Sequence, residues 1–296
     1  MKRKIIACFL ICQVISCSLI ANEACCYPCE LDDCMPFEQP CSFSFTPYLA
    51  SRWGKGRGYE RGFQSIEVVG AFSRNSNRFL FTDLRILRVE PGKIAGNLGV
   101  GWRTAVSPSR DLFGVNVFYD FRNYSKHYFH QFGLGIEYLT CFLDLRMNGY
   151  LPVGEKQARF KQQTFDYGDG FIANIEELQN SLWGLDVEIG KHFRFEPLGF
   201  CLFVGIGPYY YDDFICNCCP TSFLGGMARV SATICNNLNL EFFYTYDRIF
   251  KGRPQFQITW SLPFTCLGPC LAKFISRVER NPIIVTTPSC EYQTNF

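Results

Sequence analysis

Side chains that could carry acid–base chemistry recur along this chain of 296 residues. Asp83, His127 and His130 are the candidates for a general acid or base, because imidazoles and carboxylates are the usual proton-transfer groups. The chain has only three His, no Gly-x-Ser-x-Gly nucleophile motif and no Gly-rich phosphate loop. We therefore expect no enzyme activity and no bound cofactor.

Cysteine is the second reactive residue type, with 17 copies in the chain. Two clusters, which begin at Cys25 and at Cys216, have the close spacing of metal ligands. Neither cluster forms the paired C-x-x-C of a zinc site, and no His lies near, so we expect no metal. The candidates for disulfide bonds, within the chain or to other envelope proteins, are Cys25, Cys26, Cys29, Cys34, Cys41, Cys216, Cys218, Cys219, Cys266, Cys270 and Cys290.

The N-terminus has the three parts of a secretory signal peptide. Lys2, Arg3 and Lys4 are basic, an apolar run continues to Ile20, and small residues follow. This predicts a cleaved signal peptide over residues 1–21, and export would permit disulfides. Cys17 leaves lipid attachment open as an alternative. The formal net charge of +2 gives no reason to expect binding to nucleic acid.

Segments of about ten residues alternate between apolar and polar positions, which is the period of a β-strand. Leu98, Val100 and Trp102 share one face of such a segment, whereas Asn97 and Arg103 lie on the other. The apolar faces are free of charge over the height of a bilayer, and aromatic residues lie near the ends, as in a transmembrane β-barrel. The residues that fit the aromatic girdle are Tyr119, Phe121, Tyr138, Tyr150, Tyr209, Tyr244, Tyr246 and Trp260.

Twelve such segments are found, and bacterial barrels have an even number of strands. We expect strands at 62–72, 78–88, 94–105, 111–122, 127–139, 141–151, 158–168, 181–192, 199–211, 222–234, 237–247 and 253–264. The segment at 158–168 is the weakest because it is polar. The opposite faces predict a charged lumen lined by Asp83, Arg85, Arg103, Asp120, Glu137, Asp144, Arg146, Asp186, Glu188, Arg229, Glu241 and Asp247.

Several stretches resemble one family of barrels. These are Leu80 to Arg85, Gly96 to Arg103, Leu112 to Asp120, His130 to Leu139 and, above all, Asn148 to Gly154. Together they are similar to the barrel of the intimin and invasin group, the inverse autotransporters. The resemblance implies an outer-membrane barrel of twelve strands with a periplasmic N-terminus. It also implies a C-terminal linker that threads the pore, and Arg277 to Val285 is similar to that linker.

The expected organisation has four parts. A signal peptide covers 1–21, a Cys-rich periplasmic segment covers 22–61, and an all-β antiparallel transmembrane barrel covers 62–264. A helix near 270–280 and an extended linker cover 265–296. Family adhesins continue into extracellular immunoglobulin-like domains, and we expect this chain to lack that passenger.

We expect an outer-membrane anchor or translocator of a Gram-negative bacterium, serving surface display or cell adhesion. The expected partners are outer-membrane lipid, the barrel assembly machinery and a host or cell-surface receptor. The outward loops at 168–180 and 212–221 are the candidates for receptor contact. The alternatives are a passive porin-like channel and a structural envelope protein cross-linked by disulfides.

Overall fold

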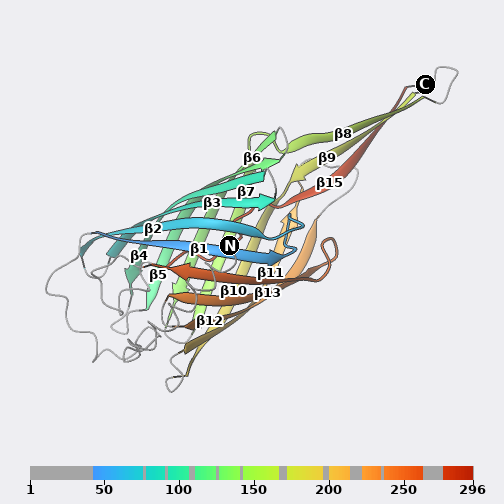
Figure 1. Cartoon of the computed structure of the whole chain (residues 1–296). Coiled ribbons are helices and arrows are strands. Elements are labelled where there is room, and N and C mark those ends of the chain that lie inside the picture. Colours follow the sequence, from blue (N-terminus) through green and yellow to red (C-terminus); the bar gives the residue numbers. More distant parts are fainter. Residues whose placement is uncertain are drawn as a thin grey trace, which may run out of the picture.

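The chain forms a closed antiparallel β-barrel from which a smaller sheet projects (Figure 1). The computed structural model describes residues 43–75, 78–90, 93–106, 111–124, 127–140, 143–166, 172–195, 200–213, 222–234, 237–262 and 276–295. Barrel and projecting sheet together contain fifteen strands within these ranges.

Twelve strands form the barrel, in the order β1, β14, β13, β12, β11, β10, β7, β6, β5, β4, β3, β2. It closes where β1 pairs with β14, from Tyr48 opposite Ser261 to Gly54 opposite Gln255. Closure leaves no sheet edge whose backbone amides would be unpaired in hydrocarbon. The bounds are β1 Phe43–Gly54, β2 Phe63–Asn75, β3 Arg78–Glu90, β4 Lys93–Ala105, β5 Leu112–Tyr124, β6 His127–Leu139, β7 Leu143–Val153, β10 Trp183–Phe195, β11 Phe200–Asp212, β12 Phe223–Ile234, β13 Leu238–Asp247 and β14 Arg253–Ser261.

The fold class expected from the sequence is confirmed, but one of the twelve expected strands lies outside the barrel and one barrel strand was not expected. The barrel begins with β1 at Phe43, not at residue 62, so part of the expected Cys-rich segment is a barrel strand. The expected strand at 158–168 corresponds to β8, Gln157–Asp166, which lies outside the barrel. Its polar sequence offers no apolar face to lipid, so it pairs beyond the wall. One missed strand and one surplus strand leave the total at twelve.

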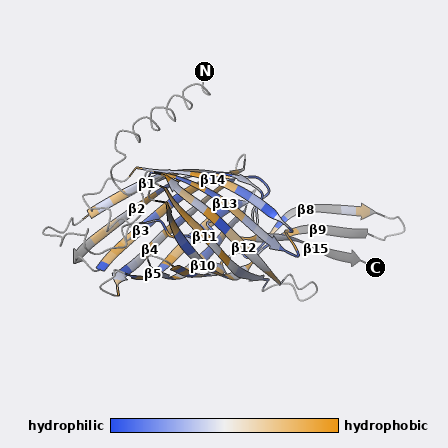
Figure 2. Cartoon of the chain, turned by 90° about the horizontal axis from the view of Figure 1, so that it is seen from below, coloured by the Kyte–Doolittle hydropathy of each residue, from blue (hydrophilic) through white to orange (hydrophobic). Residues whose placement is uncertain are grey.

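The wall of the barrel has an apolar outer face and a polar inner face. Leu98, Val100 and Leu134 are more than half exposed on the outside, whereas the inward Asn97 and Asn116 are buried. Apolar and hydrophilic segments alternate along the barrel strands in Figure 2. A closed barrel with this inversion is a transmembrane barrel. Among the described residues, no helix is long and apolar enough to cross a membrane.

We name the two ends of the barrel by the strands that meet there. The entry rim holds the start of β1 and the end of β14, and the exit rim holds the opposite ends of these strands. Beyond the exit rim, β8, β9 (Ile172–Ser181) and β15 (Thr286–Asn295) form a three-stranded sheet in the order β15, β9, β8 (Figure 1). The segment expected as a loop at 168–180 therefore contains a strand.

The C-terminal part of the chain after β14 is largely extended. Residues 276–280 are not helical, in contrast to the helix expected over 270–280, and the rest of that range lies outside the described residues. Val278 does not lie on a helix but packs against Phe79 and Phe81 inside the barrel. Residues 277–280 are buried or partly buried and residues 281–285 are fully buried within the barrel, before the chain leaves it as β15.

Candidate functional site

The charged lumen is the largest collection of polar side chains in the described part of the chain. The residues expected to line it all lie on barrel strands with their side chains away from lipid, and all are buried except Arg146, which is 12% exposed. Acidic groups exceed basic ones among them, as the sequence indicated. The members are Asp83, Arg85, Arg103, Asp120, Glu137, Asp144, Arg146, Asp186, Glu188, Arg229, Glu241 and Asp247.

Most of these charges pair with one another within the wall, either along one strand, between adjacent strands or across the strand that lies between them. Arg103 donates from Nε to Glu137 Oε1 at 2.6 Å, and Arg229 donates from Nη2 to Glu188 Oε2 at 2.8 Å. Arg85 lies 2.9 Å from Glu67, a residue that the sequence analysis did not assign to the lumen. Glu67 alternates in step with Ser65 along β2, so the strand period alone could have placed it. A buried charge persists only with such partners, because its desolvation costs several kcal/mol.

The lumen is not empty, because the C-terminal segment runs through it. We call residues 276–285 the threaded segment. Its apolar members Val278, Ile283, Ile284 and Val285 are all at most 2% exposed. The pore-threading linker expected from the resemblance is thereby confirmed.

Wall side chains bind the backbone carbonyls of the threaded segment at successive heights. Near the entry rim, Arg103 Nη1 donates to the carbonyl of Ser276 at 2.7 Å. Further along, Asn97 Nδ2 donates to the carbonyl of Pro282 at 3.0 Å. Near the exit rim, Arg122 Nη1 donates to the carbonyl of Ile284 at 2.7 Å. An extended chain has no internal partners for these carbonyls, so the wall supplies them.

Arg280 makes the strongest contact between the threaded segment and the wall. Its two terminal nitrogens lie 2.8 and 2.6 Å from the two carboxylate oxygens of Asp120, and both side chains are at most 2% exposed. Such a bidentate pair is both strong and geometrically specific. The Arg280 guanidinium also lies over the ring of Phe118, 4.3 Å from its centroid. Gly133 makes room for it, since a Cβ there would lie 2.4 Å from Arg280 Nη2.

A second group of charges joins the segment to β2 and β12. Arg277 lies 3.4 Å from Glu279 of the same segment and 3.9 Å from Glu67. Glu279 is also 3.4 Å from Arg229, which binds Glu188 and Glu241. The excess of acidic groups on the wall is thus partly balanced by cations that the threaded segment brings.

The loop at 55–62 folds inward at the exit rim and closes over the threaded segment. Arg253 Nη1 donates to the carbonyls of Gly56 and Tyr59 at 2.8 and 3.1 Å and so holds this loop against β14. Gly58 has a φ of +81°, and a Cβ there would lie 3.0 Å from Cα of Val285. The amide of Leu182 donates to the carbonyl of Val285 at 3.0 Å, and β15 then pairs with β9 outside the barrel.

One further charge of this loop lies at the surface. Glu60 pairs with Lys55 at 2.9 Å, and this hydrogen bond holds the pKa of the Glu60 carboxyl below its ordinary value, with Arg253 contributing in the same direction. The ionised form of Glu60 is therefore the form that holds the loop together.

Two aromatic residues expected in the lipid-facing girdle point into the lumen instead. Tyr150 is 3% exposed and donates to Asp186 at 2.9 Å, and Tyr209 is 1% exposed and donates to Asp247 at 2.6 Å. Tyr150 also accepts from the amide of Asn281 at 2.8 Å. A phenol at a strand end fits either a lipid interface or a lumen with carboxylates, so residue type alone did not decide between them.

The candidate acid–base residues do not converge. Asp83 is buried in the lumen against Arg85, whereas His130 lies on the outer face and bonds Tyr119 at 2.7 Å. His127 pairs with Glu155 at 3.0 Å. No group of three or more potential metal ligands occurs among the described residues. The candidate disulfide cysteines lie outside the described residues, except for the backbone of Cys290 in β15.

Comparison with known proteins agrees with this architecture. The family model for the inverse autotransporter β-domain matches residues 55–194. This part of the chain is therefore similar to the inverse autotransporter β-domain. Its matched part runs from the loop at the exit rim to β10, and it includes Asp120 and Tyr150, two wall residues that bind the threaded segment.

Solved structures also resemble this barrel. A structure from a study of in-meso crystallization of membrane proteins has 13% identity and a TM-score of 0.59, covering 82% of this chain and 100% of that chain. An outer membrane channel from Pseudomonas putida F1 has 10% identity and a TM-score of 0.45, covering 78% and 99%. The β domain of the Bordetella autotransporter BrkA has 10% identity and a TM-score of 0.32, covering 74% and 98%. No curated protein sequence matches this chain.

The inverse autotransporter β-domain is an outer-membrane barrel that acts as translocator and anchor, not an enzyme family. In this chain the threaded segment fills the lumen, so the arrangement can hold a polypeptide across the membrane.

Proposed function

We propose that this barrel anchors the chain in the bacterial outer membrane and displays the segment that leaves its exit rim on the cell surface. The observation that carries the proposal is the threaded segment, which is fixed to the wall from Ser276 to Val285 and continues as β15 beyond the rim. A polypeptide held in this way has one end on each side of the membrane.

The proposed orientation places the exit rim outside the cell. Its connections include the longest in the barrel, at 154–182 and 213–222, whereas those at the entry rim, such as 76–77 and 140–142, are short. Outer-membrane barrels have short periplasmic turns and longer extracellular loops. The sheet of β8, β9 and β15 is then the surface offered to a host or neighbouring cell.

Labelling of Cys290 tests the orientation and the display together. Intact cells are gently reduced and treated with a membrane-impermeant maleimide, and the label is located by peptide mass spectrometry. The proposal expects labelled Cys290 without lysis, and the Cys290→Ser variant shows which signal belongs to this residue. Labelling of Cys290 only after lysis would contradict surface display.

The two alternative functions have less support. A passive channel requires an open lumen, and here the threaded segment occupies it. A structural envelope protein requires disulfides to other proteins, and the cysteines concerned lie outside the described residues, apart from the backbone of Cys290. Contact with the barrel assembly machinery and with a receptor remains part of the proposal.

A further inference from the structure

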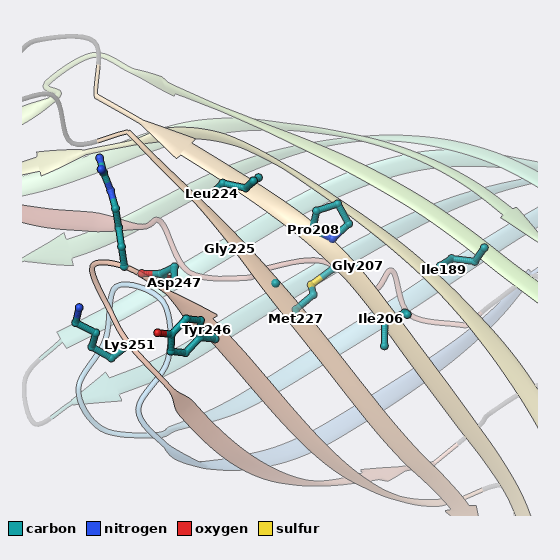
Figure 3. A pocket seen from close by; sticks show the side chains of 12 residues that line it. Ile189, Ile206, Gly207, Pro208, Leu224, Gly225, Met227, Tyr246, Asp247 and Lys251 are labelled. Carbon is teal, nitrogen blue, oxygen red and sulfur yellow. The ribbon is translucent and has the colours of Figure 1, made fainter.

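The outer wall carries a groove near the exit rim, over β11, β12 and β13 (Figure 3). The groove follows from residue size across the strands. Pro208, Gly226 and Tyr246 lie side by side in register, so a residue without a side chain stands between two large ones. In the next outward row Ala228 stands between Ile206 and Tyr244. The small residues on β12 thus leave a groove between the larger side chains of β11 and β13.

The groove is apolar, open and large enough for a ligand. Leu224, Ile206 and Tyr246 are 69%, 59% and 58% exposed along it. A Cβ added at Gly226 would meet no atom within 4 Å. The volume is about 820 Å³, which lies within the range of about 300 to 1,000 Å³ of small-molecule sites. On a transmembrane wall, this space is filled by lipid chains.

Two cations stand at the exit-rim end of the groove. Arg248 and Lys251 line it and are exposed. Arg248 Nη2 donates to the carbonyl of Ser222, which ties its loop to the neighbouring strand connection. Lys251 has a φ of 59°, a left-handed conformation that is unfavourable for a residue other than Gly. The loop keeps this conformation and places Lys251 above the groove.

The nearby carboxylate does not cancel these cations. Asp247 also lines the groove, but it is only 2% exposed. Its Oδ2 accepts from Tyr209 on the lumen side, and its Oδ1 accepts from the amides of Ile249 and Phe250 at 2.7 and 2.6 Å. Among the charged side chains that line the groove, Arg248 and Lys251 are therefore the ones exposed to a ligand.

We propose that this groove is a binding site for a phosphorylated lipid of the outer leaflet. An acyl chain lies along Gly226 and Ala228, and a head-group phosphate binds Lys251 and Arg248. Basic residues at the membrane surface attract anionic head groups, and apolar grooves bind chains by area burial. The inference rests on the proposed orientation, since the exit rim must face the outer leaflet for this lipid to be the occupant in the cell.

Native mass spectrometry of the whole chain in detergent measures the binding directly. The probe is a bisphosphorylated lipid A, and the same lipid without its phosphates is the chemical control. Lys251→Gln is expected to weaken retention of lipid A about fivefold, the effect of one surface cation. Gly226→Leu places a side chain in the groove, where its Cβ meets no atom within 4 Å, and is expected to abolish a defined bound lipid. Lys191→Gln, at an exposed position outside the groove, is the matched control and is expected to leave retention unchanged.

Two results would overturn the proposal. One is equal retention of lipid A by the wild type, Lys251→Gln and Gly226→Leu. The other is equal retention of the phosphorylated and phosphate-free lipids by the wild type. Each variant is checked for folding by its heat-dependent mobility in electrophoresis. Binding in detergent does not depend on which rim faces outward, so a failure of surface display in the Cys290 experiment would be recognised separately.

Discussion

Replacing Arg280 with Met should open the closed barrel intermittently. In the wild type the Arg280 guanidinium neutralises Asp120 at 2.6 and 2.8 Å in a site from which water is excluded. Met fills a similar volume but leaves Asp120 charged. Among the described residues, its remaining hydrogen-bond donors are the amide groups of Asn97 and Gln131, at 2.7 and 3.0 Å. When the threaded segment leaves, water enters and solvates Asp120. The penalty therefore falls on the closed state.

The size of this penalty follows from the burial of the pair. Removing one partner of a buried ion pair costs about 3 to 5 kcal/mol. Because about 1.4 kcal/mol corresponds to a factor of ten, the ratio of open to closed barrels should rise between about a hundredfold and a few thousandfold. The double variant Arg280→Met with Asp120→Asn removes both charges, and most of the closed population should return.

Single-channel recording in planar bilayers measures the ratio. The wild type should conduct rarely, Arg280→Met should show transient openings, and deletion of residues 276–296 should conduct continuously. Asp144→Asn is the matched control, because it disturbs an ion pair with Arg146 and a contact with His192 within the wall. If Arg280→Met opens as rarely as the wild type, the ion pair with Asp120 does not hold the threaded segment in the lumen. If the deletion variant does not conduct either, the threaded segment is not what closes the lumen.

Three further predictions concern the threaded segment and its loop. Gly133→Val should lower the melting temperature and increase conductance, because its Cβ would lie 2.4 Å from Nη2 of the pinned Arg280. Gly58→Ala should lower the free energy of unfolding by about 1 to 2 kcal/mol, because Gly58 has a φ of +81°, and by more if the added Cβ displaces the threaded segment. Urea titration measures this change. At pH values above 4.5, the ordinary pKa of a Glu carboxyl, Glu60 should stabilise the loop. This stabilisation should be lost as the pH falls through the lowered pKa of Glu60. Protease resistance of the loop should then be constant from neutral pH to about 4.5 and decline below it, whereas Glu60→Gln should remove that decline.

The sequence predicted which face of most barrel strands points outward, but it was less reliable for the aromatic residues of the lumen. Residues such as Leu98 and Asn97 sit on the expected faces because strand period is a local property of two neighbouring positions. Tyr150 and Tyr209 were misplaced because an amphipathic ring suits both an interface and a lumen. The strand at Phe43 to Gly54 was missed because its Pro and Ser residues interrupt the apolar side, and its identity is decided by pairing with β2 and β14.

By itself, the sequence determined a transmembrane barrel with charged residues inside, an even set of strands and a C-terminal segment long enough to cross it. Only the tertiary structure decided which twelve strands close, and that β8 and β9 leave the wall to meet β15. It alone paired Arg280 with Asp120 across 160 positions of the chain. The physical reason is range: alternation is set by adjacent residues in contact with lipid or water, whereas a buried charge is satisfied by whichever partner the closed barrel brings within hydrogen-bonding distance.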